Sequence, residues 1–120
     1  MLGLRTTIYK VGDIERAKDW YRRAFGVKPY FDQPYYVGFN IGGYELGLQP
    51  LKSPTTIKTE SVVSYWGVKK IQQEYDRLLE LGATAYEAPV NVGGELMTAT
   101  VKDPWGNVIG LIYNPYFKAE

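Results

Sequence analysis

The stretch ELGLQP at residues 45–50 has a counterpart, GLIYNP, at residues 110–115, which is 65 positions further along the chain. A second correspondence, VGDI at residues 11–14 with VKKI at residues 68–71, has a shift of 57 positions. The difference of eight residues is absorbed in the loops of the second half, mainly around Asn91 and Asp103. The chain is therefore expected to contain two copies of one structural unit.

The first copy, repeat one at about residues 4–50, predicts a strand, a helix and three further strands. Asp13 is suited to cap the start of the helix, because its carboxylate can accept hydrogen bonds from free backbone amides. Apolar residues from Ile14 to Phe25 recur at helical spacing, and Gly26 is expected to end the helix. Strands are predicted at residues 4–11, 28–32, 35–41 and 44–49, with turns at Pro34 and at Gly42-Gly43.

The second copy, repeat two at about residues 61–115, follows a polar linker at residues 51–60. It predicts the same order of elements. The helix begins near Ile71 and is closed by Gly82. Strands are predicted at residues 61–68, 84–87, 95–102 and 107–113, with turns at residues 91–94 and 103–107.

A β-α-β-β-β unit of this size cannot bury both sides of its sheet alone, because its single helix covers one face only. The expected fold is therefore α+β, with the two repeats forming a curved mixed sheet in one domain over residues 1–120. The helices would lie outside, and the concave cleft inside would have to be filled by side chains, a ligand or a partner chain.

The composition excludes several chemistries. The 120 residues include no Cys and no His, so thiolate nucleophiles, Ser-His-Asp triads and Cys-type zinc sites cannot be built from this chain. A metal ion would need a shell of oxygen ligands. Aromatic residues are abundant at 15%, with 11 Tyr, and Tyr suits both sheet packing and stacking on a flat ligand.

Charge and hydropathy give no sign of a nucleic-acid or membrane partner. Lys and Arg total 14 against 13 Asp and Glu, which leaves a formal net charge of +1 and no basic patch of the kind that nucleic acids need. No apolar run has the length of a membrane span. The N-terminal residues do not read as a signal peptide, and we expect a cytoplasmic protein.

Several motifs together resemble the glyoxalase I / bleomycin-resistance / extradiol-dioxygenase superfamily, also called vicinal oxygen chelate. The first half carries VGDI at residues 11–14, with Trp20-Tyr21 and Phe25-Gly26 at the end of the helix. The second half carries LLELGA at residues 78–83 and DPWGN at residues 103–107, which resembles the family's turn before its last strand. The resemblance runs from about residue 4 to 115. It implies the paired-repeat fold, a small-molecule ligand and a homodimer.

The same resemblance implies four positions for metal ligands, on the first and last strand of each repeat. In this chain they fall on Thr6, Glu45, Val63 and Gly110. Glu45 alone is a usual ligand, since Val63 and Gly110 offer no side-chain donor and Thr6 is a neutral hydroxyl. One carboxylate and one hydroxyl hold a divalent ion poorly against water. We therefore predict no metal and no cofactor.

Candidate ligand-binding residues are Glu45 and Thr6, together with the aromatic residues Tyr35, Phe39, Tyr65 and Trp105. The first hypothesis is a metal-free protein that binds a small aromatic or amphipathic molecule, antibiotics included. The alternative is a lyase, isomerase or dioxygenase with an atypical metal site around Glu45. A third hypothesis is that the protein is a dimeric regulatory module that has kept the fold and lost its ligand. The catalytic residues of the enzyme alternative are not identified by the sequence.

Overall fold

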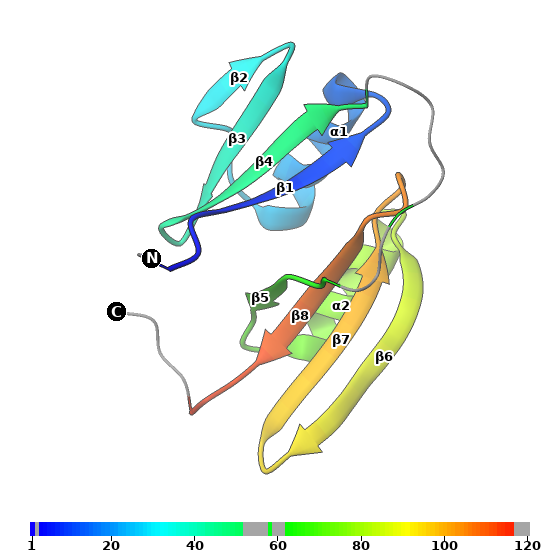
Figure 1. Cartoon of the computed structure of the whole chain (residues 1–120). Helices are drawn as coiled ribbons and strands as arrows, with labels where there is room; N and C mark the ends of the chain where they lie inside the picture. Colours follow the sequence, from blue (N-terminus) through cyan, green and yellow to red (C-terminus); the bar gives the residue numbers. More distant parts are fainter. Residues whose placement is uncertain (2, 52–57, 59–61, 117–120) are drawn as a thin grey trace. The chain divides into compact units, whose positions relative to one another are not determined.

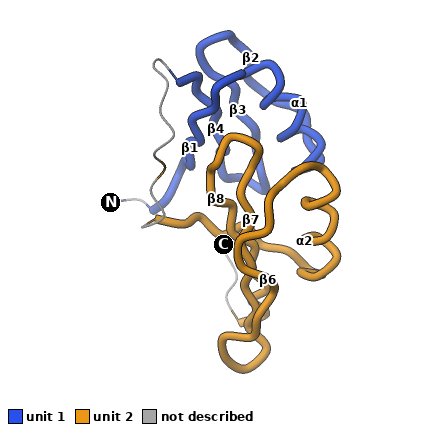
Figure 2. The backbone as a smooth tube through the Cα atoms, turned by 90° about the vertical axis from the view of Figure 1, so that its right-hand side faces the viewer, with its two compact units in different colours: residues 1–56 blue, residues 57–120 orange. Residues whose placement is uncertain are grey.

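A computed structural model of the chain describes residues 1, 3–51, 58 and 62–116. The expected linker at residues 51–60 lies almost wholly outside the described residues. The chain divides into two compact units, Met1–Thr56 and Ile57–Glu120, which Figure 2 distinguishes by colour. The boundary between the two units falls inside the expected linker.

The first unit contains five elements in the predicted order, β-α-β-β-β (Figure 1). They are β1 (Thr6–Val11), α1 (Ile14–Phe25), β2 (Phe31–Gln33), β3 (Tyr36–Ile41) and β4 (Tyr44–Pro50). Its four strands form one mixed sheet in the order β1-β4-β3-β2, with β1 and β4 parallel and the other pairs antiparallel.

The second unit repeats this topology. Its elements are β5 (Tyr65–Gly67), α2 (Ile71–Glu80), β6 (Thr84–Gly93), β7 (Leu96–Lys102) and β8 (Val108–Tyr113). The sheet order is β5-β8-β7-β6, again with only the first pair parallel. The α+β fold with two β-α-β-β-β repeats is therefore confirmed, as two four-stranded mixed sheets.

The two helices begin differently. Asp13 caps α1 as predicted, with its Oδ1 accepting from the Arg16 backbone amide at 3.1 Å. Gly26 ends α1 in the left-handed region, at φ 72°, and its amide donates to the Arg22 carbonyl. At the start of α2 the capping position is Lys70, whose side chain makes no cap hydrogen bond. The first helix therefore carries a stabilising N-cap that the second lacks.

The helix α1 covers one face of the first sheet (Figure 1). Tyr9 of β1 stacks on Tyr21 of α1 with ring centroids 5.7 Å apart. Because side chains alternate across a strand, the register puts Leu46 and Leu48 on this same face. These side chains are buried, together with Val37 and Phe39 of β3. The first unit thus has its apolar core between α1 and the sheet.

In the second sheet, Ala99 and Val101 of β7 share a face with Ile109 and Leu111 of β8, and all four are buried. We place the core of this unit here, because α2 contributes the buried Ile71, Tyr75 and Leu78 and runs behind the sheet in Figure 1. None of the helices in the described part of the chain has the length and apolar content to cross a membrane.

Three strands differ from the expectation by three residues or more at one end. The strand predicted at residues 28–32 is assigned at Phe31–Gln33. The strand predicted at residues 84–87 extends to Gly93 and includes Pro89. It lies at the edge of its sheet, where a missing amide donor is tolerated, and its pairing with β7 contains three register shifts. The strand predicted at 61–68 is assigned only at Tyr65–Gly67, and residue 61 lies outside the described residues.

Candidate functional site

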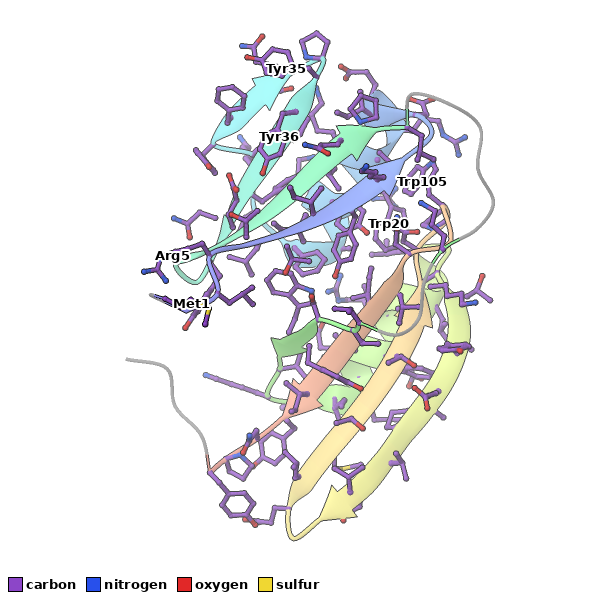
Figure 3. The ribbon with its side chains drawn as sticks, viewed as in Figure 1. Met1, Arg5, Trp20, Tyr35, Tyr36 and Trp105 are labelled. Carbon is purple, nitrogen blue, oxygen red and sulfur yellow. The ribbon has the colours of Figure 1, made fainter. Side chains whose placement is uncertain are left out.

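The candidate site lies on the face of the first sheet that α1 does not cover. Thr6 pairs with Glu45 across β1 and β4, and Asn40 pairs with Glu45 across β3 and β4. Glu45 has the opposite parity to the buried Leu46, so its carboxylate points away from the helix. Figure 3 shows Tyr36 on this face, which is turned toward the viewer.

Three hydroxyl groups donate hydrogen bonds to the Glu45 carboxylate. Thr6 Oγ1 donates to Oε1 at 2.9 Å, and Tyr36 Oη donates to the same oxygen at 2.8 Å. Tyr30 Oη donates to Oε2. The three donors come from β1, from β3 and from the segment before β2, so two strands of the sheet and the segment that leads into a third assemble the site. We call Glu45 with these three residues the glutamate cluster.

Two glycines make room for the tyrosine rings. Gly38 and Gly47 face each other across β3 and β4, on the same side as Glu45. A Cβ atom on Gly47 would lie 2.1 Å from Tyr36 Oη, and one on Gly38 would lie 3.1 Å from Tyr30 Cε1. Neither glycine has a positive φ, so their role is the close approach of the rings and not a special backbone conformation.

Aromatic side chains continue from the glutamate cluster toward β2. The Phe31 ring lies 6.2 Å from the Tyr36 ring, and also 6.2 Å from the Tyr35 ring in an edge-to-face arrangement. Tyr35 lies in the turn between β2 and β3 (Figure 3) and is exposed. The face thus combines one carboxylate with a run of partly exposed rings, which suits a ligand with a flat apolar part.

The hydroxyl donors set the electrostatics of the site. The hydrogen bond from Tyr30, followed by those from Tyr36 and Thr6, holds the pKa of Glu45 below its ordinary value, against the opposing effect of burial. Burial and the hydrogen bond to Glu45 raise the pKa of Tyr36. The hydrogen bond to Glu45 also raises the pKa of Tyr30. The cluster therefore keeps one negative charge at neutral pH.

A carboxylate with a lowered pKa is a weak proton acceptor, so the cluster is poorly suited to general-base catalysis near neutral pH. It is well suited to accept hydrogen bonds from a ligand and to attract a positive charge. Among the described residues, the hydrogen-bond partners of the Glu45 carboxylate are the three neutral hydroxyls, so no side-chain cation of the cluster cancels its charge.

The donor set does not fit the metal centre that the family resemblance implies. Thr6 uses its hydroxyl proton on Glu45, so it holds the carboxylate and is a poor metal ligand. Among residues 1, 3–51, 58 and 62–116, no three Asp or Glu side chains gather where a metal could be held. Val63 and Gly110, the two family positions in the second unit, have no side-chain oxygen or nitrogen that could serve as a metal ligand.

The sequence puts the family positions of the second unit at Val63 and Gly110. In the structure Gly110 pairs with Tyr65, two residues after Val63. A Cβ atom on Gly110 would lie 2.6 Å from Tyr65 Cδ1, so the Tyr65 ring lies over the glycine. Where the first sheet carries a carboxylate, the second therefore carries the side of a tyrosine ring.

The remaining candidates are dispersed. Phe39 is fully buried and shares the helix-covered face with Leu46, so it belongs to the core and not to the face of Glu45. Trp105 lies in the second unit, in the turn at residues 103–107, where its amide donates to Asp103 Oδ1 at 2.9 Å. Of the predicted ligand-binding residues, Glu45 and Thr6 are joined by a hydrogen bond. Tyr35 is linked to the glutamate cluster indirectly, because its ring contacts the Phe31 ring, which in turn lies near the Tyr36 ring.

Sequence reasoning missed Tyr30 and Tyr36 as partners of Glu45. The signal was present in the Gly42-Gly43 turn. A two-residue hairpin pairs Ile41 with Tyr44 and Asn40 with Glu45. Counting back by twos from Asn40 places Gly38 and Tyr36 on the face of Glu45 and places Phe39 on the other.

The comparisons with known proteins agree with the fold. The sequence profile described as glyoxalase/bleomycin resistance protein/dioxygenase superfamily matches residues 3–111. Among curated proteins, none matches the chain significantly.

Several solved structures share the fold at low sequence identity. A glyoxalase-related enzyme from Fulvimarina pelagi has a TM-score of 0.83 at 18% identity, over 100% of this chain and 94% of the other. A glyoxalase/bleomycin resistance protein from Albidiferax ferrireducens T118 has a TM-score of 0.76 at 19% identity, over 92% and 98%. TioX from Micromonospora sp. ML1 has a TM-score of 0.73 at 18% identity, over 92% and 98%. At these identities the likeness concerns the fold alone.

Proposed function

Because the chain belongs to the glyoxalase/bleomycin resistance protein/dioxygenase superfamily, we propose that it uses this fold to bind a small aromatic or amphipathic molecule without a metal ion. The observation that carries the proposal is the Glu45 carboxylate, which three neutral hydroxyls hold on the helix-free face of the first sheet. The carboxylate keeps its charge in this arrangement, so it can accept hydrogen bonds from a ligand.

The surroundings of Glu45 support a ligand with an apolar part. Ile8 and Phe31 lie on the same face and are partly exposed. Each ring stacked on the ligand adds about 0.5–1.5 kcal/mol beyond the burial of apolar area. Bleomycin and other antibiotics with planar rings are ligands of this general kind.

The test is a titration of isotope-labelled protein followed by nuclear magnetic resonance, with bleomycin and with 9-aminoacridine as probes. Binding at the proposed site shifts the signals of Thr6, Tyr36 and Glu45. Glu45→Gln then weakens binding about tenfold or more, because hydrogen bonds to charged groups contribute about 1.5–3 kcal/mol. A chelator leaves the affinity unchanged.

The matched control is Glu87→Gln in the second unit. Glu87 also accepts a threonine hydroxyl, from Thr100 at 2.9 Å, but it lies on the edge strand β6. This variant keeps the wild-type affinity. Equal weakening by both variants, or no binding of either probe, contradicts the proposal. A stoichiometric divalent ion in the purified protein, lost in Glu45→Gln, supports the enzyme alternative instead.

A further inference from the structure

The two oxygens of Glu45 are held unequally. Oε1 accepts from Tyr36 and from Thr6, at 2.8 and 2.9 Å, and both bonds are partly buried. Among the described residues, Oε2 accepts from Tyr30 alone. Tyr30 is 64% exposed. One oxygen is therefore fixed from within the sheet, whereas the other is covered by a side chain that borders on solvent.

The two tyrosines are also anchored differently. Tyr36 belongs to β3, its hydroxyl reaches Glu45 across Gly47, and its ring packs near Phe31. Tyr30 precedes β2. Its backbone amide is fixed by a hydrogen bond to the Gly38 carbonyl at 2.9 Å, and its ring extends over Gly38. Rotation of the Tyr30 side chain uncovers Oε2 without breaking a backbone hydrogen bond, whereas movement of Tyr36 disturbs a packed ring.

From these contacts we propose that Oε2 of Glu45 is the ligand-facing atom, and that the Tyr30 hydroxyl covers it in the free protein and gives way to an N–H group of a cationic ligand. The inference rests on the proposed function and deepens it. The ligand class is a protonated amine or amidine that carries an apolar ring. Thr6 and Tyr36 act as positioning residues, which hold Oε1 while the exchange takes place at Oε2.

The exchange is favourable because the cationic N–H donor brings a positive charge to the carboxylate, so Coulomb attraction is added to a hydrogen bond that the neutral Tyr30 hydroxyl makes without it. The displaced Tyr30 hydroxyl is exposed and can hydrogen-bond to water instead. A quaternary ammonium ion has the charge but no N–H donor, so it cannot replace the bond that Tyr30 makes. The proposal therefore predicts that the site prefers cations with an N–H donor over cations of the same charge that lack one.

The first experiment compares benzamidinium with phenyltrimethylammonium by titration calorimetry on the 120-residue chain. Both probes carry one ring and one positive charge, but only benzamidinium has N–H groups. Benzamidinium is expected to bind about tenfold more tightly. In the nuclear magnetic resonance spectrum its binding moves the Tyr30 ring signals toward those of a free tyrosine, while the Tyr36 ring signals shift less.

The second experiment separates the roles of the hydroxyls with benzamidinium as the probe. Tyr30→Phe removes the competing donor and is expected to strengthen binding about two- to tenfold, the equivalent of one net hydrogen bond. Tyr36→Phe and Thr6→Val loosen the carboxylate and weaken binding by a similar factor. Thr6→Ser keeps the hydroxyl and restores the affinity. Circular dichroism of each variant checks that the fold is retained.

The outcomes distinguish the two proposals. If Tyr30→Phe weakens binding as much as Tyr36→Phe, or if phenyltrimethylammonium binds as tightly as benzamidinium, the assignment of Oε2 is overturned while ligand binding at Glu45 stands. If none of the aromatic probes binds the wild-type chain, the proposed function fails and the assignment fails with it. If the chemical shifts of the Tyr30 ring do not change when benzamidinium binds, the proposed displacement of the Tyr30 hydroxyl is also overturned.

Discussion

The two sheets share one topology but present different chemistry on their helix-free faces. In the first sheet the strand beside β1 carries Glu45, which three hydroxyls surround. In the second sheet the corresponding position beside β5 is Gly110, and the Tyr65 ring lies over it. The same backbone thus holds a charge in one unit and a ring in the other.

The helix-covered faces, in contrast, are alike. Leu46 follows Glu45 and Leu111 follows Gly110, and both leucines are buried. The apolar alternation that forms the core is kept in both repeats, while the intervening positions are free to differ. The comparison teaches that the fold is determined by one face of each sheet and the candidate chemistry by the other.

The largest effect should come from the shared face. Leu46→Ala and Leu111→Ala each remove a side chain that is at most 4% exposed, and each is expected to lower the free energy of unfolding by about 2–5 kcal/mol. Urea unfolding followed by circular dichroism measures both. A loss in only one of the two variants would break the equivalence of the repeats.

The second prediction compares the two places where a tyrosine side chain lies over a glycine, Tyr65 over Gly110 and Tyr36 over Gly47. In Gly110→Ala the new Cβ would meet the Ser64 carbonyl oxygen at 2.8 Å and Tyr65 Cδ1 at 2.6 Å. These atoms belong to the backbone or lie near it, so they cannot easily move. We expect a loss of about 1–3 kcal/mol in the free energy of unfolding, as for other overpacked sites.

Gly47→Ala is the matched variant. Its new Cβ would meet the far end of the Tyr36 side chain, which can move at the cost of its hydrogen bond to Glu45. That cost is about 1.5 kcal/mol, the lower end for a hydrogen bond to a charged group, because the bond is only partly buried. Binding of benzamidinium weakens at the same time. Equal losses of stability in the two alanine variants would show that the Tyr36 ring is as fixed as the Tyr65 ring.

The third effect concerns the helix starts. Asp13→Ala removes the N-cap of α1 and should lower the free energy of unfolding by about 1 kcal/mol, whereas Lys70→Asp gives α2 a cap and should raise it by about as much. Thermal unfolding of the two variants measures the opposite signs. A stabilising Asp13→Ala variant would contradict the assigned cap.

Much of this fold follows from local sequence signals. The cap at Asp13, the glycine at the end of α1 and the Gly42-Gly43 hairpin are each specified by a residue or pair with a distinct conformational preference. The end of β6 was not predictable in this way. Pro89 and the Asn91 segment resemble strand breakers, but the edge position of β6 tolerates both.

The candidate site was predictable only in part. Glu45 and Thr6 follow from the repeat and the family resemblance, because both depend on aligned strands. Tyr36 could have been assigned to the face of Glu45 from the alternation of side chains along the hairpin. Tyr30 could not, because it precedes β2 and its hydroxyl reaches Glu45 by passing over Gly38 of β3. The pairing of Tyr65 with Gly110 could not be predicted, because an alignment by fixed shifts carries no register information for β5.

The smallest effect is the pH dependence of the glutamate cluster. The hydroxyl donors, Tyr30 first, hold the pKa of Glu45 below its ordinary value of 4.5. The folded chain therefore binds this proton more weakly than the unfolded chain. The stabilisation is fully present above pH 4.5 and is lost as the pH falls through the folded pKa. Between pH 6 and pH 3, wild-type stability should fall more than that of Glu45→Gln.

The opposite sign holds for Tyr36, whose pKa is raised by burial and by the hydrogen bond to Glu45. Its contribution to stability is present below the ordinary tyrosine pKa of 10.0 and is lost as the pH rises toward the folded value. Urea unfolding at pH 3, 6, 8 and 10.5 should therefore show Glu45→Gln with the shallower acid side and Tyr36→Phe with the shallower alkaline side. Because the second sheet has Gly110 where the first has Glu45, Gly110→Ala should keep the wild-type slopes on both sides. A variant of Gly110 that flattened the acid side would mean that the titrating group lies in the second sheet and not in the glutamate cluster.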